Sequence, residues 1–363
     1  MDNLFSEAVT RQLERCIFDV SRYYADHTDV IKKMNVMDYG YKKFICYLRS
    51  IFGNKRKAVD SILNFNLCDF SWLYNKLTID EDKELLSKIV ARRMLSSEKV
   101  QLCDVKREYD LFQKIKKDFS LESERVDENL IDKNWKLYLM NMSRYGSDIN
   151  FFVNDVVIFY SFAKKQYEYK KAGIYPRYGD TVIDAGGCYG DTALVFANMV
   201  GCHGVVYSFE MNKSNIQVFE KNCQNNRKLS KIVKIIDKPL YSIKDIEFFV
   251  NEKRAGSTIY KDDRNLVDSY SVRSLTIDDF MKDYEVEKLN FIKMDIEGSE
   301  LEALKGASDS IKKYKPQMAL SVYHKKNDLD EIPKFVYNLV PEYKFYLRHH
   351  SCSDLETILY CSV

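Results

Sequence analysis

The stretch DTVIDAGGCYGDT, residues 180–192, decides the fold, because it joins a short apolar strand to a glycine-rich turn and then to the start of a helix. Asp184 lies at the carboxyl end of the predicted strand. The turn that follows contains three glycines, Gly186, Gly187 and Gly190. Glycine allows backbone angles and close approaches that a Cβ atom would block, so a ligand can touch the main chain here. The pattern predicts a nucleotide-type cofactor loop.

The loop lacks the chemistry of a phosphate site. It contains no GxxxxGK[ST] sequence, and no lysine follows Gly190 to neutralise phosphates, which disfavours a P-loop. The carboxylate of Asp184 would repel a pyrophosphate but can accept hydrogen bonds from an amino-acid ammonium group. The next apolar segment, residues 204–209, ends in Glu210, where a carboxylate can accept both hydroxyls of a ribose. The two carboxylates together favour S-adenosylmethionine as the cofactor.

From about residue 165 to the end, the chain resembles the FkbM-type S-adenosylmethionine-dependent methyltransferases. The likeness is carried by SFEMNKSN (208–215), LTIDDF (275–280), FIKMDIEGSELEALKGA (291–307), SVYHKKNDLDEIP (321–333) and YLRHHS (346–351). The resemblance implies an α/β fold of class I, a Rossmann-like methyltransferase with a seven-stranded sheet. It also implies that the acceptor is a hydroxyl of a sugar, a glycan or a related metabolite.

Composition is that of a globular enzyme, with 45% hydrophobic and 30% charged residues in a chain of 363. The net charge of +2 provides no basic field for nucleic acid, and no NPPY-type motif suggests an RNA methyltransferase. Nine cysteines at irregular spacings are typical of reduced thiols. The charged, amphipathic start is unlike a signal peptide, and no run of about 18 apolar residues predicts a membrane span. We expect a cytoplasmic protein.

The organisation of the chain changes near residues 150 to 170. Before this point glycine and proline are scarce and apolar residues recur at helical spacing, as at Phe44, Leu48 and Ile51, which predicts a helical N-terminal domain over residues 1–160. This domain would shape the acceptor site or form a homodimer contact. Residues 165–363 form the predicted methyltransferase domain. We expect parallel strands at 181–184, 204–209, 232–236, 290–295 and 317–323, closed by an antiparallel hairpin of 343–347 and 357–361.

Ligands of such sheets bind beyond the carboxyl ends of the strands, and this rule selects the candidate site residues. The cofactor-binding candidates are Asp184, Gly186, Cys188, Tyr189, Gly190, Asp191, Glu210 and Asp237. Asp191 begins a helix and can accept its backbone amides, and Asp237 follows the third strand near the expected adenine. Cys188 has no partner cysteine at the spacing of a redox couple, so we expect its thiol to be only a small side chain.

The catalytic candidates are Asp295, Glu297, His324 and His350. His324 is the candidate base for the acceptor hydroxyl, although a histidine that merely ends a strand is the alternative. The pair His349 and His350 ends another strand, and one of the two would join the crevice. Two carboxylates and an imidazole also suit a divalent cation, so metal dependence stays open and Asp295 is taken to orient the acceptor.

These expectations amount to an S-adenosylmethionine-dependent O-methyltransferase that acts on a small-molecule or glycan acceptor. Two alternatives remain: a non-catalytic module that binds S-adenosylmethionine for interaction with a partner, and a methyltransferase acting on a non-sugar acceptor. Neither nucleic acid nor a membrane is expected as a partner.

Overall fold

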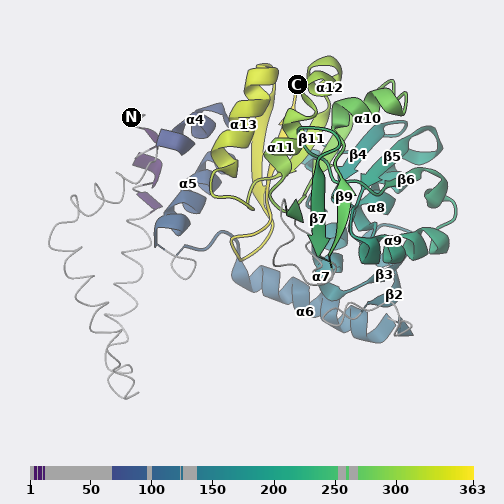
Figure 1. The fold of residues 1–363 in the computed structure, drawn as a ribbon. Coiled ribbons are helices and arrows are strands. Elements are labelled where there is room, and N and C mark those ends of the chain that lie inside the picture. Colours follow the sequence, from purple (N-terminus) through teal and green to yellow (C-terminus); the bar gives the residue numbers. More distant parts are fainter. Residues whose placement is uncertain are drawn as a thin grey trace. The chain divides into compact units, whose positions relative to one another are not determined.

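The computed structural model describes residues 4–5, 7–9, 11–12, 68–95, 100–122, 124–125, 137–251, 259–260 and 269–363. The chain divides into two compact units, Met1–Cys103 and Asp104–Val363 (Figure 1). The predicted helical spacing at Phe44, Leu48 and Ile51 lies outside the described residues. Within the described residues, no helix is long and apolar enough to cross a bilayer.

The described part of the first unit is helical, as predicted. Helix α4 covers Cys68–Lys76 and helix α5 covers Asp80–Leu95. Three acidic residues begin α5 and two arginines lie in its last turn, an order of charges that suits the helix dipole. Arg92 is buried and its Nη1 donates to the carbonyl oxygen of Val100 at 2.9 Å, so the chain that follows α5 is tied back to it.

The second unit is built on a seven-stranded sheet in the order β12-β13-β11-β10-β4-β5-β6 (Figure 1). Its strands are β4 (Thr181–Ala185), β5 (Val205–Phe209), β6 (Val233–Ile236), β10 (Phe291–Met294), β11 (Gln317–Ser321), β12 (Lys344–His349) and β13 (Thr357–Ser362). Strands β6, β5, β4, β10 and β11 are parallel, and β13 pairs antiparallel with both β11 and β12. The predicted five parallel strands, the terminal hairpin and the class I methyltransferase sheet are confirmed.

The inner strands β4, β10, β11 and β13 are buried on both faces, which explains their continuous apolar runs. Val182, Val206 and Phe291 are in register and face one side, where Phe291 packs edge-on against Phe196 of helix α8 at a ring distance of 5.6 Å. On the other face, Phe280 of helix α10 packs against Tyr207. The helices that cover the sheet are α8 (Asp191–Val200), α9 (Lys213–Asn225), α10 (Ile277–Asp283), α11 (Glu300–Lys305), α12 (Ser308–Tyr314) and α13 (Asp328–Leu339).

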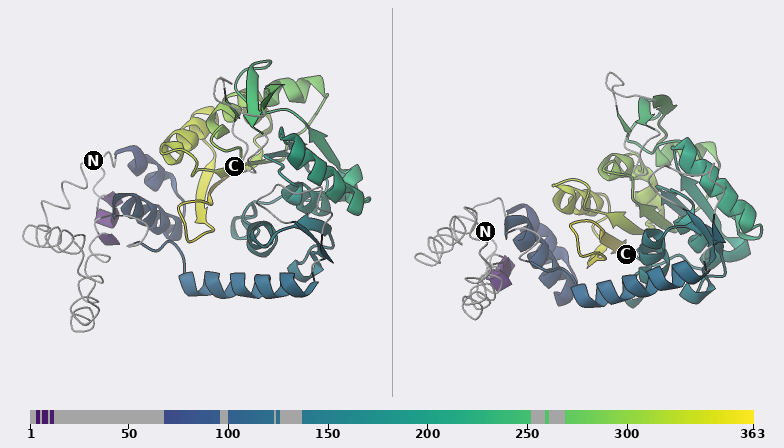
Figure 2. Two further views of the ribbon diagram at one scale, coloured as in Figure 1. Left: turned by 60° about the horizontal axis from the view of Figure 1, so that its bottom comes forward. Right: turned by 90° about the horizontal axis from the view of Figure 1, so that it is seen from below.

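Residues 104–164 belong to the same unit as the sheet and are not wholly helical. They form α6 (Val105–Glu122), β1 (Glu124–Arg125), β2 (Tyr138–Asn141), β3 (Asn150–Val153), α7 (Asp155–Val157) and a π-helix, η3 (Ile158–Lys164) (Figure 2). Side chains of α9 and of the residue that follows it bond the main chain of β3. Asn222 of α9 accepts from the N–H of Phe152, and Asn226, directly after α9, bonds both the N–H and the carbonyl of Asn150. The hairpin of β2 and β3 is therefore tied to the sheet domain. The functional division at residues 160 to 165 stays a prediction.

Besides the main sheet and the antiparallel sheet β1-β2-β3, a further three-stranded antiparallel sheet lies in the chain between β6 and α10, and the sequence did not predict it. Its order is β8-β7-β9, from β7 (Glu247–Asn251), β8 (Ile259–Tyr260) and β9 (Ser269–Arg273). The remaining described elements are short 3-10 turns: η2 (Ser143–Tyr145), η4 (Lys170–Ala172), η5 (Gly201–His203) and η6 (Leu229–Lys231).

Candidate cofactor and acceptor site

The glycine-rich loop after β4 has a backbone that only glycine fits. Gly186 and Gly190 have φ angles of 86° and 84°. A Cβ atom on Gly186 would lie 1.9 Å from the carbonyl oxygen of Asp295, and one on Gly190 would lie 2.2 Å from the ring of Phe219. The loop is therefore pressed against both its neighbouring strand end and α9, as the sequence pattern predicts for a loop that a ligand approaches closely.

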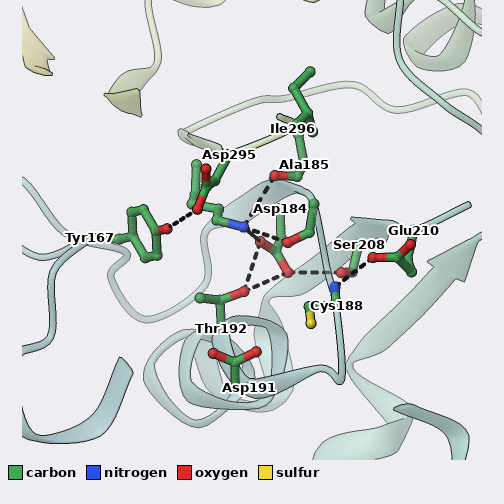
Figure 3. Close-up of polar contacts among 12 residues, drawn as sticks. Tyr167, Asp184, Ala185, Cys188, Asp191, Thr192, Ser208, Glu210, Asp295 and Ile296 are labelled. Carbon is green, nitrogen blue, oxygen red and sulfur yellow. Dashed lines mark hydrogen bonds and ion pairs between the residues drawn. The ribbon is translucent and has the colours of Figure 1, made fainter. Parts of the chain in front are cut away.

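Glu210 ties this loop to the end of β5. The N–H of Cys188 donates to Oε2 of Glu210 at 2.8 Å (Figure 3). The N–H of Asn212 donates to Oε1 at 2.8 Å. Cys188 has a φ of 45°, a left-handed conformation that is uncommon for a residue with a side chain. Burial raises the pKa of Glu210 to about 7, against the lowering effect of the two backbone amides. The side chain of Asn215 also bonds this carboxylate, which keeps acceptor capacity for a ligand hydroxyl.

Asp184 is fully buried, and its carboxylate is satisfied within the protein. The hydroxyl of Thr192 donates to its two oxygens at 2.9 and 3.0 Å, and the hydroxyl of Ser208 donates to Oδ2 at 2.8 Å (Figure 3). The ammonium of Lys293, from β10, lies 3.2 Å from Oδ1. The sequence predicts that Asp184 binds the ammonium group of a ligand. In the structure, the ammonium of Lys293 is in contact with that carboxylate.

Lys293 also bonds the main chain of the loop. Its Nζ donates to the carbonyl oxygens of Ala185 at 3.1 Å and Gly186 at 2.5 Å. Burial alone would lower the pKa of Lys293, but the negative charges of Asp184, Asp295 and Asp191 outweigh it and raise the pKa above the usual value. The side chain is therefore a charged ammonium inside the sheet.

Asp191 begins α8 and is buried beside the same loop. Its Oδ2 accepts a short hydrogen bond from the hydroxyl of Ser161, which lies on the π-helix η3. Burial raises the pKa of Asp191, and the hydrogen bond from Ser161 opposes this rise. Burial also raises the pKa of the Cys188 thiol, with Asp191 and Glu210 adding to the effect, so the thiol stays protonated and unreactive.

The other two cofactor candidates lie further from the carboxylates. Tyr189 is buried, and its carbonyl oxygen accepts from Nδ2 of Asn222 at 2.9 Å, so it fastens the loop to α9. Asp237 is exposed after β6 and lines an open groove of about 680 Å³, together with Met211 and Tyr270. Met211 follows Glu210 directly in the chain. The contact of Asp237 with an adenine stays a prediction.

Asp295 follows β10 and is held by two tyrosines. The hydroxyl of Tyr167 donates to Oδ2 at 2.6 Å, and the hydroxyl of Tyr323 donates to Oδ1 at 3.2 Å. Nε2 of His324 lies 3.4 Å from Oδ1. The structure therefore brings the predicted pair Asp295 and His324 together at the carboxyl ends of β10 and β11.

Three carboxylates surround His324. Besides the contact with Asp295, Nε2 lies 3.5 Å from Oε2 of Glu297, and Nδ1 lies 2.9 Å from Oε1 of Glu300. Burial alone would lower the pKa of His324, but the contact with Glu300 and the charges of Asp295 and Glu297 raise it to about 9. At neutral pH, His324 is therefore an imidazolium.

The turn between β10 and α11 explains how these acids converge. Glu297 and Gly298 both have left-handed φ angles, 55° and 93°. The fully buried Glu300 accepts hydrogen bonds at Oε1 from the N–H of Ile296 at 2.9 Å and of Gly298 at 3.3 Å. Glu300 thus shapes the turn and also faces His324.

A divalent cation stays a prediction. Within the described chain, ligand atoms of Asp295, Glu300 and His324 all lie within 4.8 Å of one another. Oxygen and imidazole nitrogen are suitable ligands for such an ion. An imidazolium held between carboxylates explains the same spacing without a metal.

His350 lies apart from this group. Its ring is buried and Nε2 lies 3.0 Å from the hydroxyl of Tyr360, while its carbonyl oxygen accepts from Nζ of Lys164. Burial lowers the pKa of His350 to about 3, with the charge of Lys164 next in effect, so the ring is neutral. The neighbouring His349 contacts Thr357. These contacts tie together β12, β13 and the end of η3.

Several side chains of the site were not predicted from the sequence, among them Ser161, Tyr167, Lys293, Tyr323 and Glu356. Lys293 had a signal, because a lysine inside the apolar run FIKM must be paired if the strand is buried. Glu356, in the turn before β13, has a φ of 67°, and burial followed by the charge of Asp295 raises its pKa to about 8. Nothing in the pattern around Ser161 or Tyr167 indicates their distant partners.

Comparison with known proteins agrees with this geometry. Residues 184–347 match the family model described as the methyltransferase FkbM domain. No curated protein matches the chain. Among solved structures, the methyltransferase FkbM of Methylobacillus flagellatus KT aligns at a TM-score of 0.52 and 19% identity, over 82% of this chain. The alignment covers 58% of that protein's length, and it shows a shared fold.

Two further solved structures align at lower scores. Fibrillarin of Aeropyrum pernix, in complex with bound S-adenosyl-L-methionine, has 13% identity and a TM-score of 0.33, over 66% of this chain and 97% of its own. An S-adenosylmethionine-dependent O-methyltransferase of Thermotoga maritima has 13% identity and a TM-score of 0.34, over 55% and 65%. Likenesses at this level add nothing to the assignment.

Proposed function

Because this chain is a member of the FkbM methyltransferases, with their domain at residues 184–347, we propose that it transfers a methyl group from S-adenosylmethionine to a hydroxyl oxygen. The acceptor is a small molecule or a glycan, and a sugar hydroxyl is favoured by the family resemblance. The observation that carries the proposal is the cluster of His324, Asp295 and Glu297 at the strand ends beside the glycine-rich loop.

The residues around the loop fit the cofactor. Its cradle cannot admit a Cβ atom at Gly186 or Gly190, and Glu210 offers carboxylate lone pairs at the place expected for a ribose. Asp191 and Asp295 add negative charge, while the positive charge of Lys293 is paired within the protein. Such a surrounding favours a cationic sulfonium over a phosphate. When bound, the cofactor supplies an electrophilic methyl group.

The chain's own residues would orient the acceptor and take its proton. Tyr167 and Tyr323 fix the carboxylate of Asp295, so that it can accept a hydrogen bond from an acceptor hydroxyl in one orientation. His324, once deprotonated, accepts the hydroxyl proton, and the neighbouring carboxylates stabilise the imidazolium that forms. Because the surrounding carboxylates raise the pKa of His324 to about 9, turnover should rise as pH increases toward that value.

The test uses isolated protein, methyl-labelled S-adenosylmethionine and a panel of neutral, amino and acidic sugars and glycans. We expect label in an oxygen-linked methyl group. His324→Gln should lower turnover about 10²- to 10⁴-fold while calorimetry shows unchanged binding of S-adenosylhomocysteine. Label found only on an amine or a thiol would refute O-methyl transfer. Binding of S-adenosylhomocysteine without any transfer across the panel would favour the non-catalytic binding module instead.

A further inference from the structure

Lys293 is a charged residue in the middle of a buried parallel strand. All four residues of β10 are buried, and Lys293 is 2% exposed. Since an unpaired buried ammonium is strongly unfavourable, its partners define its role. Figure 3 shows these partners, Asp184 and Ala185, beside the turn of the loop.

The ammonium of Lys293 has three N–H groups, and three acceptors surround it: the carbonyl oxygens of Ala185 and Gly186, and Oδ1 of Asp184. The same carboxylate accepts from the hydroxyls of Thr192 and Ser208. Both sides of this arrangement are therefore satisfied without a ligand. A cofactor ammonium could bind Asp184 only by displacing a lysine from a fully buried ion pair.

Asp191 is the acid of the loop that retains acceptor capacity. It follows Gly190 directly, and its Oδ2 accepts from Ser161. A carboxylate has about four lone-pair positions, so the hydroxyl of Ser161 and the N–H of Asp191 itself leave about half of them available. Asp191 also begins a helix of ten residues and lies within the electrostatic influence of Lys293. It is buried but stands on the same loop that approaches the cofactor.

We propose that the ammonium of Lys293 occupies the position on Asp184 that the ammonium of the ligand would otherwise take. The α-amino group of S-adenosylmethionine is then recognised by Asp191. Lys293 is then a positioning residue that binds the carbonyl oxygens of the loop. Asp191 determines the specificity for a cofactor that carries an α-amino group. The inference rests on the proposed function, because it presupposes that the loop binds S-adenosylmethionine.

Calorimetry with two ligands tests this assignment. S-adenosylhomocysteine carries the α-amino group, and its desamino analogue has hydrogen in that place. The wild type should bind S-adenosylhomocysteine about 10- to 100-fold more tightly, as expected for one charge-assisted hydrogen bond. In Asp191→Asn the preference should fall to within about threefold, while the affinity for the desamino analogue changes little.

Two further variants serve as controls. Glu287→Gln removes the same unit of charge at an exposed position before β10, and it should keep the wild-type preference. The charge-neutral pair Asp184→Asn with Lys293→Met should also keep a preference for S-adenosylhomocysteine, even if both affinities fall because the loop is less well held. Should that pair fail to fold by circular dichroism, Asp191→Asn decides alone.

The outcomes separate the two proposals. An Asp191→Asn protein that keeps the full preference, or a wild type that binds both ligands equally, would overturn the role of Asp191. If the preference for S-adenosylhomocysteine is lost in the Asp184→Asn and Lys293→Met double variant but kept in Asp191→Asn, then Asp184 binds the ammonium group and the proposal is wrong. A wild type that binds neither ligand would instead contradict the proposed function itself.

Discussion

The ionisation of His324 provides a direct test of the site geometry. Its ring lies between Asp295, Glu297 and Glu300, which raise the pKa from about 6.5 to about 9 in spite of burial. A rise of about 2.5 units corresponds to about 3 kcal/mol of preference for the protonated ring in the folded protein. The contact of Nδ1 with Glu300, at 2.9 Å, is the strongest of the raising effects.

Imidazole NMR can measure this value, because the sequence has only five histidines. We expect the resonance that disappears in His324→Gln to titrate near pH 9. In Glu300→Gln the midpoint should fall by more than one unit, since the amide keeps an oxygen for the N–H groups of Ile296 and Gly298 but loses the charge. His350 should stay neutral across the same range, because its pKa is lowered to about 3.

The same shift predicts a pH dependence of stability. Because the folded-state pKa of His324 is raised, its contribution to the free energy of unfolding is fully present below about pH 6.5. It is lost as pH rises through about 9. Compared with wild type, His324→Gln should therefore be less stable by about 2 to 3 kcal/mol near pH 6 and by much less near pH 10. A midpoint near 6.5, with equal stability losses at both pH values, would refute the arrangement around the ring.

Three further predictions concern other parts of the molecule. Glu210→Ala should weaken S-adenosylhomocysteine binding by about 2 to 4 kcal/mol in calorimetry, while NAD and ATP fail to bind the wild type; unchanged affinity would exclude the ribose assignment. A fragment of residues 104–363 should be monodisperse in light scattering, whereas one that begins at residue 165 should aggregate because α8 and α9 lose their cover; a soluble, active shorter fragment would contradict this. A chelator should leave turnover unchanged if Asp295 only orients the acceptor; inactivation that Mg²⁺ or Mn²⁺ reverses would assign a metal to Asp295.

The sequence predicted those features of the site that depend on local pattern. A strand followed by glycines indicates the loop, and acidic residues at strand ends locate Asp184, Glu210 and Asp295 at one edge of the sheet. The terminal hairpin followed from two apolar runs without a helical pattern between them. The small sheet of β7, β8 and β9 was not predicted, because β8 has only two residues and β9, SYSVR, has no continuous apolar run. Its strands pair only with one another, apart from the main sheet.

Long-range contacts could not be predicted in this way. Tyr167 reaches Asp295 across 128 positions of the chain, and Ser161 reaches Asp191 across 30. These contacts depend on how the segment 158–167 packs beside the loop, which no periodicity encodes. The pKa of His324 likewise depends on the burial of Glu300, since an exposed glutamate at the same distance would be screened by water.

For Asp184, the sequence motif predicts the position of the residue but not the group that it binds. Its place after β4 follows from the sequence, and so does its capacity to bind an ammonium group. Which ammonium group it binds depends on the register of the strands. Lys293 on β10 lies directly beside Asp184 on β4. A lysine there fulfils the electrostatic requirement of Asp184 from within the protein. The motif therefore predicts the position of the acid. Because the strand register pairs this acid with Lys293, the ammonium group of the cofactor needs another carboxylate on the loop.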